Sequence, residues 1–221
     1  TVNRDNSLIK LCPSLKVLGF FTPINYQYLN DNDEDYGSDG ALLIPDAHLS
    51  VSGSKEGKLY VVDYKNMGGT TPDNSNVNQT LQLSSTGSQD VKNVHGTPVY
   101  YKDEYGNEYM YGWAEESLLH QYPFNRNTML FDTLNQKIGL SRLPTGMPGA
   151  MLALSSNGSE HGTGILWASH PINGDAEHAI VPGVLQAFDA TDITHELWSS
   201  NWSNKRDSIG KFAKFVPPTI A

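Results

Sequence analysis

One strand pattern occurs four times along the chain, and this repetition limits the folds that the sequence can form. A small residue is followed by alternating apolar positions in four segments: SLIKLCP at 7–13, GKLYVVD at 57–63, SLLHQYP at 117–123 and GVLQAFD at 183–189. Alternation over this length is typical of β-strands. Self-similarity at spacings of 50, 60 and 66 residues predicts a chain built from repeated supersecondary units.

Two further strand patterns precede three of these segments, and each set begins after a glycine, at Gly40, Gly96 and Gly149. Turns rich in Gly, Asn and Asp, such as DEYGNE and SSNGSEHGTG, separate the strands. A fourth strand is visible after the first and last units, as KVLGFF and HELWSSN. Four antiparallel strands in each repeated unit predict an all-β fold, a β-propeller of four-stranded blades.

The phase of the repeat predicts a single partial propeller domain with about three full blades and two partial ones. The boundaries are 1–38 for a blade end, 39–95, 96–148 and 149–204 for full blades, and 205–221 for the start of the next blade, where VPPTIA resembles a first strand. Propellers close with about 4 to 8 blades. We therefore expect the chain to be a fragment of a longer protein, or its ring to be completed by another chain such as a second copy. An open array of sheets with charged edges is the alternative.

Charge and hydropathy exclude several classes of partner. The formal net charge is −9 and the 15 basic residues are scattered, so a nucleic-acid interface is not expected. No apolar run approaches the roughly 20 residues of a membrane-spanning helix. The remaining partners are a saccharide, a protein or a further copy of the chain, and the many aromatic residues (11 Tyr and 4 Trp) suit a ligand-binding face.

Three sequons predict N-glycosylation at Asn78, Asn157 and Asn201, all in segments that resemble loops. Chance matches in an Asn-rich chain are the alternative interpretation. The single cysteine, Cys12, does not identify a compartment, and as the end of an apolar strand it is expected to act as a small hydrophobe. No secretory signal is visible after Thr1, which fits a processed chain or an intracellular one. The sequons favour a secreted, extracellular glycoprotein.

Several segments together resemble a known family. NSLIKLCPSLKVLGFFTP, DYGSDGALLIPD, SGSKEGKLYVVDYKNMGG, HGTPVYY and LQAFDATDITHELWSSN are similar to the quinoprotein-like β-propellers, which share the pyrroloquinoline quinone (PQQ) dehydrogenase repeat, and among them to a largely uncharacterised secreted subgroup. The resemblance covers nearly the whole chain and is weakest at 124–148. The tryptophan-docking pattern of the family is echoed by Ala187, Asp189, Thr191 and Trp198, with Asp192-Ile193 where Thr-Gly is expected. That pattern serves packing and turn formation.

The resemblance implies an alternative function, a PQQ-dependent oxidoreductase that acts on alcohols or sugars. Such an enzyme needs a stacked quinone, a calcium ion and an acidic base, and many members also carry a vicinal cysteine pair. The single cysteine excludes that pair within these residues. Trp113 and Trp167 could offer a stacking face, but packing between blades is the interpretation that we favour. No catalytic residue and no cofactor-binding residue is assigned.

The acidic segment NDNDEDYGSDG contains a calcium candidate at Asp31, Asp33 and Asp35. Three alternating carboxylates could converge on one hard cation. The segment departs from a calcium loop in two places, because its glycine, Gly37, comes one position late and Leu42 stands where a bidentate Glu is needed. An acidic inter-blade loop that leads into a turn explains the same residues, and we favour that explanation.

The seven histidines form no spaced pair typical of a zinc site. His161, His170 and His178 are expected around one Gly-rich loop. No nucleophile elbow is present. The sequence therefore favours a non-catalytic extracellular propeller that acts as a binding or self-assembling scaffold. The alternatives are the PQQ-dependent oxidoreductase and an intracellular assembly factor of the related propeller type.

Overall fold

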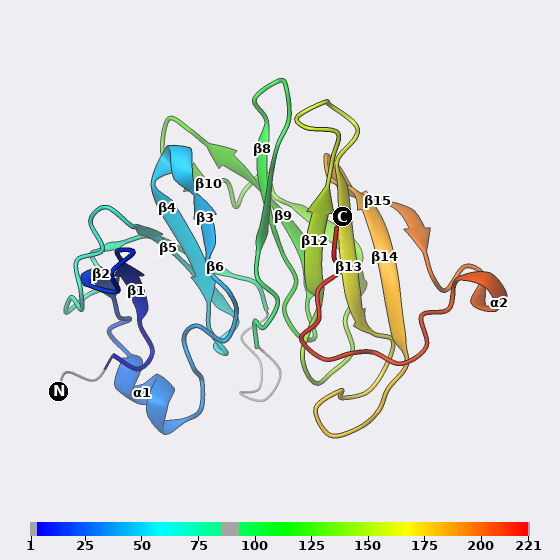
Figure 1. The fold of residues 1–221 in the computed structure, drawn as a ribbon, viewed down its shortest axis with the longest axis horizontal. Helices are drawn as coiled ribbons and strands as arrows, with labels where there is room; N and C mark the ends of the chain where they lie inside the picture. The colour runs from blue at the N-terminus through cyan, green and yellow to red at the C-terminus, as the bar shows by residue number, and fades with distance from the viewer. Residues whose placement is uncertain (1–3, 85–92, 221) are drawn as a thin grey trace.

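The computed structural model describes residues 4–84 and 93–220, which form an all-β chain of four antiparallel sheets (Figure 1). The first sheet has two strands, β1 (Leu8–Leu11) and β2 (Val17–Phe21). The second is a four-stranded meander: β3 (Leu42–Ile44), β4 (Leu49–Gly53), β5 (Lys58–Asp63) and β6 (Val77–Gln82).

The third and fourth sheets repeat this meander. The third contains β7 (Val99–Lys102), β8 (Glu108–Gly112), β9 (Leu118–Asn125), β10 (Leu130–Phe131) and β11 (Lys137–Arg142). The fourth contains β12 (Met151–Ser155), β13 (Ile165–Pro171), β14 (Gly183–Asp189) and β15 (Asp192–Ser199). The helical segments are α1 (Tyr26–Asp31), a 3-10 turn (Pro45–Ala47) and α2 (Asn204–Asp207).

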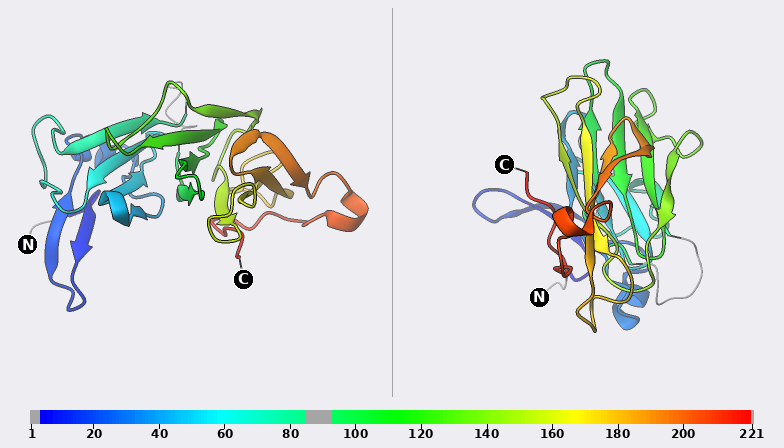
Figure 2. Two further views of the ribbon diagram at one scale, coloured as in Figure 1. Left: turned by 90° about the horizontal axis from the view of Figure 1, so that it is seen from above. Right: turned by 90° about the vertical axis from the view of Figure 1, so that its right-hand side faces the viewer.

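The sheets follow one another around an arc, which Figure 2 shows from above. The first strand of each larger sheet lies on the inner side of this arc, and β7 contacts both β3 and β12. On the outer side, β6 contacts β10 and β11 contacts β15. Each meander therefore runs from the inside of the arc to the outside, and successive sheets pack face to face.

The strand β5 shows why strands of the central sheets have nearly continuous apolar sequences. Its Leu59 and Val61 side chains belong to the cluster between the second and third sheets. Tyr60 and Val62 alternate with them and belong to the cluster between the first and second sheets. Because neighbouring side chains of a strand point to opposite faces, a sheet covered on both sides needs apolar residues at every position.

Gln121 joins the third and fourth sheets through polar contacts within this packing. Its side chain is almost fully buried and its Nε2 donates to the carbonyl oxygens of Ala190 (3.1 Å) and Thr191 (3.2 Å). Its Oε1 accepts from the Ile193 amide at 3.3 Å. The Tyr111 hydroxyl also donates to the Ala190 carbonyl. The β14–β15 turn is thus fixed to the neighbouring sheet.

The sequence predicted the all-β class and most of the strands correctly. It missed three strands, β6, β10 and β11. β6 (VNQTLQ) is mostly polar and lies at an outer edge, so it carries little apolar alternation. β10 and β11 share one edge of β9 because a turn at Asp132, which accepts from the amides of Leu134 and Asn135, interrupts the strand.

Two local predictions were wrong. VPPTIA was expected to form a strand, but residues 216–220 form none, since Pro217 and Pro218 have no N–H to donate to a ladder. Asn78 was expected in a loop, but it lies within β6, where its Oδ1 accepts from the Asp63 amide at 3.0 Å.

Gly96, just before β7, lies against the backbone just before β12. A Cβ atom at this position would lie 2.0 Å from the Ala150 carbonyl oxygen. The obstacle is backbone, so rotation of a side chain cannot relieve the clash. The start of β7 can therefore approach the start of β12 only with glycine here.

We predict that Gly96→Ala lowers the free energy of unfolding by about 3 kcal/mol, because the backbones must move apart. Gly106→Ala is the matched control: that glycine lies in the β7–β8 turn with a φ of +81° and no atom within 4 Å of an added Cβ. It should cost only about 1 kcal/mol. Urea denaturation followed by tryptophan fluorescence measures both, and equal losses would contradict the close approach.

Candidate functional site

Polar and charged side chains from all three larger sheets meet at one end of the molecule, the lower edge in Figure 1. The inner strands β3, β7 and β12 begin at this end, and the β4–β5 turn, the β8–β9 turn and the β13–β14 loop lie there as well. We call this end the loop face. Its segments are 30–40, 54–57, 93–97, 113–117, 146–151, 172–182 and 211–217.

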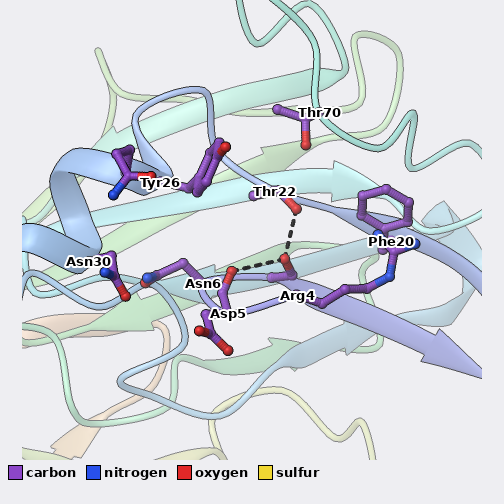
Figure 3. Close-up of a pocket in the computed structure, with 10 residues that line it drawn as sticks. Arg4, Asp5, Asn6, Phe20, Thr22, Tyr26, Asn30 and Thr70 are labelled. Carbon is purple, nitrogen blue, oxygen red and sulfur yellow. Dashed lines mark hydrogen bonds between the residues drawn. The ribbon is translucent and has the colours of Figure 1, made fainter. Parts of the chain in front are cut away.

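Three of the cavities along the loop face of the described residues adjoin one another. The first, of about 550 Å³, lies between the β1–β2 sheet and α1 (Figure 3). Tyr26 and Asn30 project from α1 on one side of it. On the other side Arg4 lies against Phe20, with the guanidinium carbon 3.6 Å from the ring centre.

Two further cavities continue along the loop face. The second has a volume of about 610 Å³ and the third about 390 Å³. The first two share Asp5, Asn6 and Asn30. The last two share Lys55, Met147 and Glu177. A ligand on the loop face can therefore contact side chains of several sheets at once.

Of the three carboxylates predicted as a calcium candidate, the structure brings only Asp33 and Asp35 together. Lys55 reaches from the β4–β5 turn and its Nζ lies 3.0 Å from Asp33 Oδ1 and 2.8 Å from Asp35 Oδ2. The lysine hydrogen bond and charge lower the pKa of Asp33. Asp31 lies apart from this pair, at the end of α1, where its Oδ1 accepts from Gln27 Nε2 at 3.0 Å. A calcium ion bound by Asp33 and Asp35 would have to displace Lys55.

Glu115 and His95 form a buried pair between the second and third cavities. The Glu115 side chain has no exposed surface, and its Oε1 lies 3.6 Å from His95 Nε2. Asn93 Nδ2 donates to Glu115 Oε2 at 3.0 Å. Neither Glu115 Oε1 nor His95 Nε2 has a hydrogen-bond partner among the described residues. These two buried atoms thus face each other slightly beyond hydrogen-bond distance.

Burial shifts both members of this pair toward their neutral forms. Desolvation, with a smaller contribution from the charges of Asp175 and Glu177, raises the pKa of Glu115 to about 7. Desolvation lowers the pKa of His95. Glu115 therefore gains and loses its proton near neutral pH, beside an imidazole whose neutral form burial favours.

A second group of titratable side chains occupies the β13–β14 loop. His178 Nδ1 lies 2.6 Å from Asp175 Oδ2 and 3.9 Å from Glu177 Oε2. The hydrogen bond to Asp175 raises the pKa of His178 and lowers that of Asp175. The prediction from sequence missed this group. Its signal is the run DAEH at 175–178, which places three metal-binding residue types within four positions.

The prediction that His161, His170 and His178 surround one loop was wrong. His170 lies within β13, and the other two lie in the loops at its opposite ends. His161 lies in the β12–β13 loop, at the other end from the loop face, and contacts Asp103 at 3.1 Å. His170 is buried within β13, with its Nε2 2.6 Å from Gln186 Oε1.

The sequons and the cysteine are accessible on the surface. Asn78, Asn157 and Asn201 are all exposed. Cys12 lies in the β1–β2 turn, half-buried, with its Sγ 3.0 Å from Ser14 Oγ. The hydrogen bond with Ser14 lowers the pKa of the thiol. The expectation that Cys12 packs as a hydrophobe at the end of a strand was therefore wrong.

The two tryptophans considered for quinone stacking lie away from the three cavities. Trp113 is buried between the third and fourth sheets, where its Nε1 donates to the Ser117 carbonyl oxygen at 3.0 Å. Trp167 lies on the opposite face of the fourth sheet, with its ring centre 6.5 Å from that of Trp198. Neither offers a stacking face on the loop face, so these residues do not fit a bound PQQ.

The residues that echo the tryptophan-docking pattern form a turn and a cross-strand pair, as the sequence predicted. Asp189 Oδ1 accepts from both the amide and the hydroxyl of Thr191, at 2.7 Å each, and so closes the β14–β15 turn. Trp198 pairs across the strands with Ala187.

Comparison with known proteins does not assign the chain to a family: no family model matches it, and no curated protein matches it in sequence. In the part of the chain that the structure describes, no helix has the length and apolar character required to cross a bilayer. The resemblance to quinoprotein-like propellers therefore stays a prediction, and function has to be argued from the loop face.

Asp39, which precedes β3 on the loop face, gives a pH-dependent prediction. Its Oδ1 accepts from the Gly53 amide at 2.7 Å, while its Oδ2 is buried without a partner. Desolvation raises its pKa from the ordinary 3.8 to about 7. The folded chain thus keeps a proton that the unfolded chain releases, so its contribution to stability is present below about pH 4 and is lost as the pH rises to about 7.

We predict that Asp39→Asn removes this loss. The variant should gain stability relative to the wild type between pH 4 and 7, on the order of 4 kcal/mol, with no further gain above pH 8. Asp46→Asn, at an exposed carboxylate in the 3-10 turn, is the control and should leave the profile unchanged. Urea unfolding at a series of pH values measures the difference. A constant offset between Asp39→Asn and the wild type would contradict the prediction.

Proposed function

We propose that the chain is part of a β-propeller of the quinoprotein-like type, and that it is an extracellular, non-catalytic scaffold that binds a ligand at the loop face. The propeller interpretation is supported by the four-stranded meanders, by their order from the inside to the outside of the arc, and by the face-to-face packing of successive sheets. A function at the loop face is supported separately, by the side chains gathered there.

The outer face of the fourth sheet supports completion of the ring by a further sheet. Ala153, Trp167, Ala187 and Trp198 form one row across β12–β15 on the face that no described sheet covers. In the second and third sheets, rows of this kind are buried by the next sheet. We propose that a continuation of a longer protein or a second copy of the chain covers this row.

The observation that carries the binding proposal is the convergence of side chains from separate sheets on adjoining cavities of about 390 and 610 Å³. Volumes of this size are typical of small-ligand sites. The walls offer amides (Asn6, Asn93), an ammonium (Lys55) and the exposed ring of Phe215, 5.3 Å from that of His95. Amides and charged groups bind hydroxyls, and an aromatic ring packs against the apolar face of a sugar ring.

We propose a neutral saccharide as the ligand class. The carboxylates of the loop face and the net charge of −9 disfavour an acidic sugar. A neutral oligosaccharide avoids this repulsion and uses both the hydrogen-bonding groups and the ring of Phe215.

Isothermal titration with chitotetraose and with cellotetraose tests this proposal. At least one should bind, and Phe215→Ala should weaken its binding about tenfold because the aromatic contact is lost. The control is Tyr105→Ala, which removes an exposed aromatic ring from the β7–β8 turn at the other end of the sheets. If neither sugar binds at millimolar concentration, or if both variants weaken binding equally, the saccharide proposal fails.

Secretion is supported by the exposure of all three sequons. We predict that the protein isolated from its source loses mass on enzymatic deglycosylation, and that Asn157→Gln and Asn201→Gln each remove one glycan in a secreting host. Asn127→Gln changes an exposed asparagine outside any sequon and should leave the mass of the glycans unchanged. Intact mass spectrometry measures each case, and an unmodified native chain would contradict the proposal.

A further inference from the structure

We propose that the ligand of the loop face is an oligosaccharide chain that passes from the second cavity into the first, where Tyr26 binds its far end. This inference rests on the proposed saccharide function. It adds a second aromatic contact and a minimum length of the ligand, because Tyr26 and Phe215 contact different sugar units of one chain.

The first and second cavities meet along a shared wall. Asp5, Asn6 and Asn30 line both of them. Of these two cavities, Phe215 lines only the second and Tyr26 only the first. A ligand that contacts both aromatic rings therefore has to pass the shared wall. Each volume alone, about 610 and about 550 Å³, is typical of a small-ligand site, so a ligand that fills both cavities is a chain rather than a single sugar.

The charges of the walls favour the first cavity over the third as the continuation of the site. Carboxylates dominate the third cavity, which is lined by Asp33, Glu34, Glu115, Asp175 and Glu177. The first cavity has one carboxylate, Asp5, and one guanidinium, Arg4, and its other lining side chains are amides, hydroxyls and aromatic rings. Neutral amides and hydroxyls can both donate to and accept from sugar hydroxyls, without the desolvation cost of burying a charge.

Figure 3 shows the two walls of the first cavity. Tyr26 and Asn30 project from α1, and Phe20 of β2 lies on the other side with the Arg4 guanidinium stacked on its ring at 3.6 Å. This stacking fixes the second wall. The Tyr26 side chain is 43 % exposed, so its ring is accessible to a ligand. A sugar unit between the walls packs its apolar face against the Tyr26 ring and directs hydroxyls toward Arg4.

Several polar groups along this path are already held in place. Asn6 has a φ of 54°, a left-handed conformation that asparagine tolerates, and its Oδ1 accepts from the Tyr36 amide at 2.6 Å. That bond fixes the plane of the amide and leaves its Nδ2 to donate to a ligand. In the first cavity, Ser7 Oγ lies 2.7 Å from Thr22 Oγ1 and donates to the Asp5 carbonyl oxygen at 3.2 Å. Side chains fixed in this way lose little conformational entropy on binding.

Isothermal titration with oligosaccharides of two lengths tests the inference. The tetraose that binds the wild type, chitotetraose or cellotetraose, is compared with the disaccharide of the same series. One equivalent of the tetraose should bind, about tenfold more tightly than the disaccharide, because only the longer chain contacts both aromatic rings.

Tyr26→Ala should lower the affinity for the tetraose about tenfold, to that of the disaccharide. Asn30→Ala, at the shared wall, should also weaken tetraose binding and serves as a second variant if Tyr26→Ala does not fold. Tyr28→Ala is the matched control, since Tyr28 lies on the same helix, is 44 % exposed and lines neither of the two cavities. It should leave both affinities unchanged. Far-UV circular dichroism checks that each variant is folded.

The inference is overturned if the disaccharide binds as tightly as the tetraose, or if folded Tyr26→Ala or Asn30→Ala binds the tetraose as tightly as Tyr28→Ala does. Binding of two equivalents of the tetraose would also overturn it, because the two cavities would then be separate sites. Each of these results leaves the saccharide proposal in place if Phe215→Ala still weakens binding. Absence of binding by both tetraoses overturns the two proposals together.

Discussion

Burial of both faces of the central sheets is the constraint on which the rest of the structure depends. β5 is an example, since Leu59 and Val61 pack toward the third sheet while Tyr60 and Val62 pack toward the first. Such a strand has no face left for exposed polar side chains. Most polar side chains therefore lie at the strand ends, and many of them lie on the loop face, where β3, β7 and β12 begin.

The same constraint explains the few polar residues that remain inside. Gln121 interrupts an apolar strand, yet its amide is fully used by the backbone of the β14–β15 turn. A buried side chain of this kind is tolerated because its hydrogen bonds are satisfied. It also fixes the position of one sheet relative to the next, which hydrophobic contacts, being non-directional, specify less sharply. The close approach of Gly96 to Ala150 has the same effect at the inner edge.

Residue patterns predicted the parts of the fold that burial imposes. GKLYVVD and GVLQAFD form strands at the predicted places because their alternation records packing on sheet faces. β6 and the split pair β10 and β11 were missed because an outer edge is half-solvated and leaves little pattern. The candidate site was predicted least well. Glu115, Asn93 and Asp175 belong to turns far apart in sequence, and only the packing of sheets brings them to one cavity.

The carboxylates of the loop face lie in two different environments, one beside Lys55 and one at the buried Glu115. Asp33 and Asp35 both pair with the Lys55 ammonium, and both carboxylates are partly exposed to solvent. Ion pairs of this kind lose little solvation free energy on forming and contribute little to stability. Glu115 is fully buried, and no Lys or Arg of the described residues forms an ion pair with it. Desolvation raises its pKa, which favours its neutral form. A fold selected for stability alone would replace such a group with an apolar one, because buried polar groups of this kind are destabilising. Its presence in the wall of the third cavity is therefore better explained by binding than by folding.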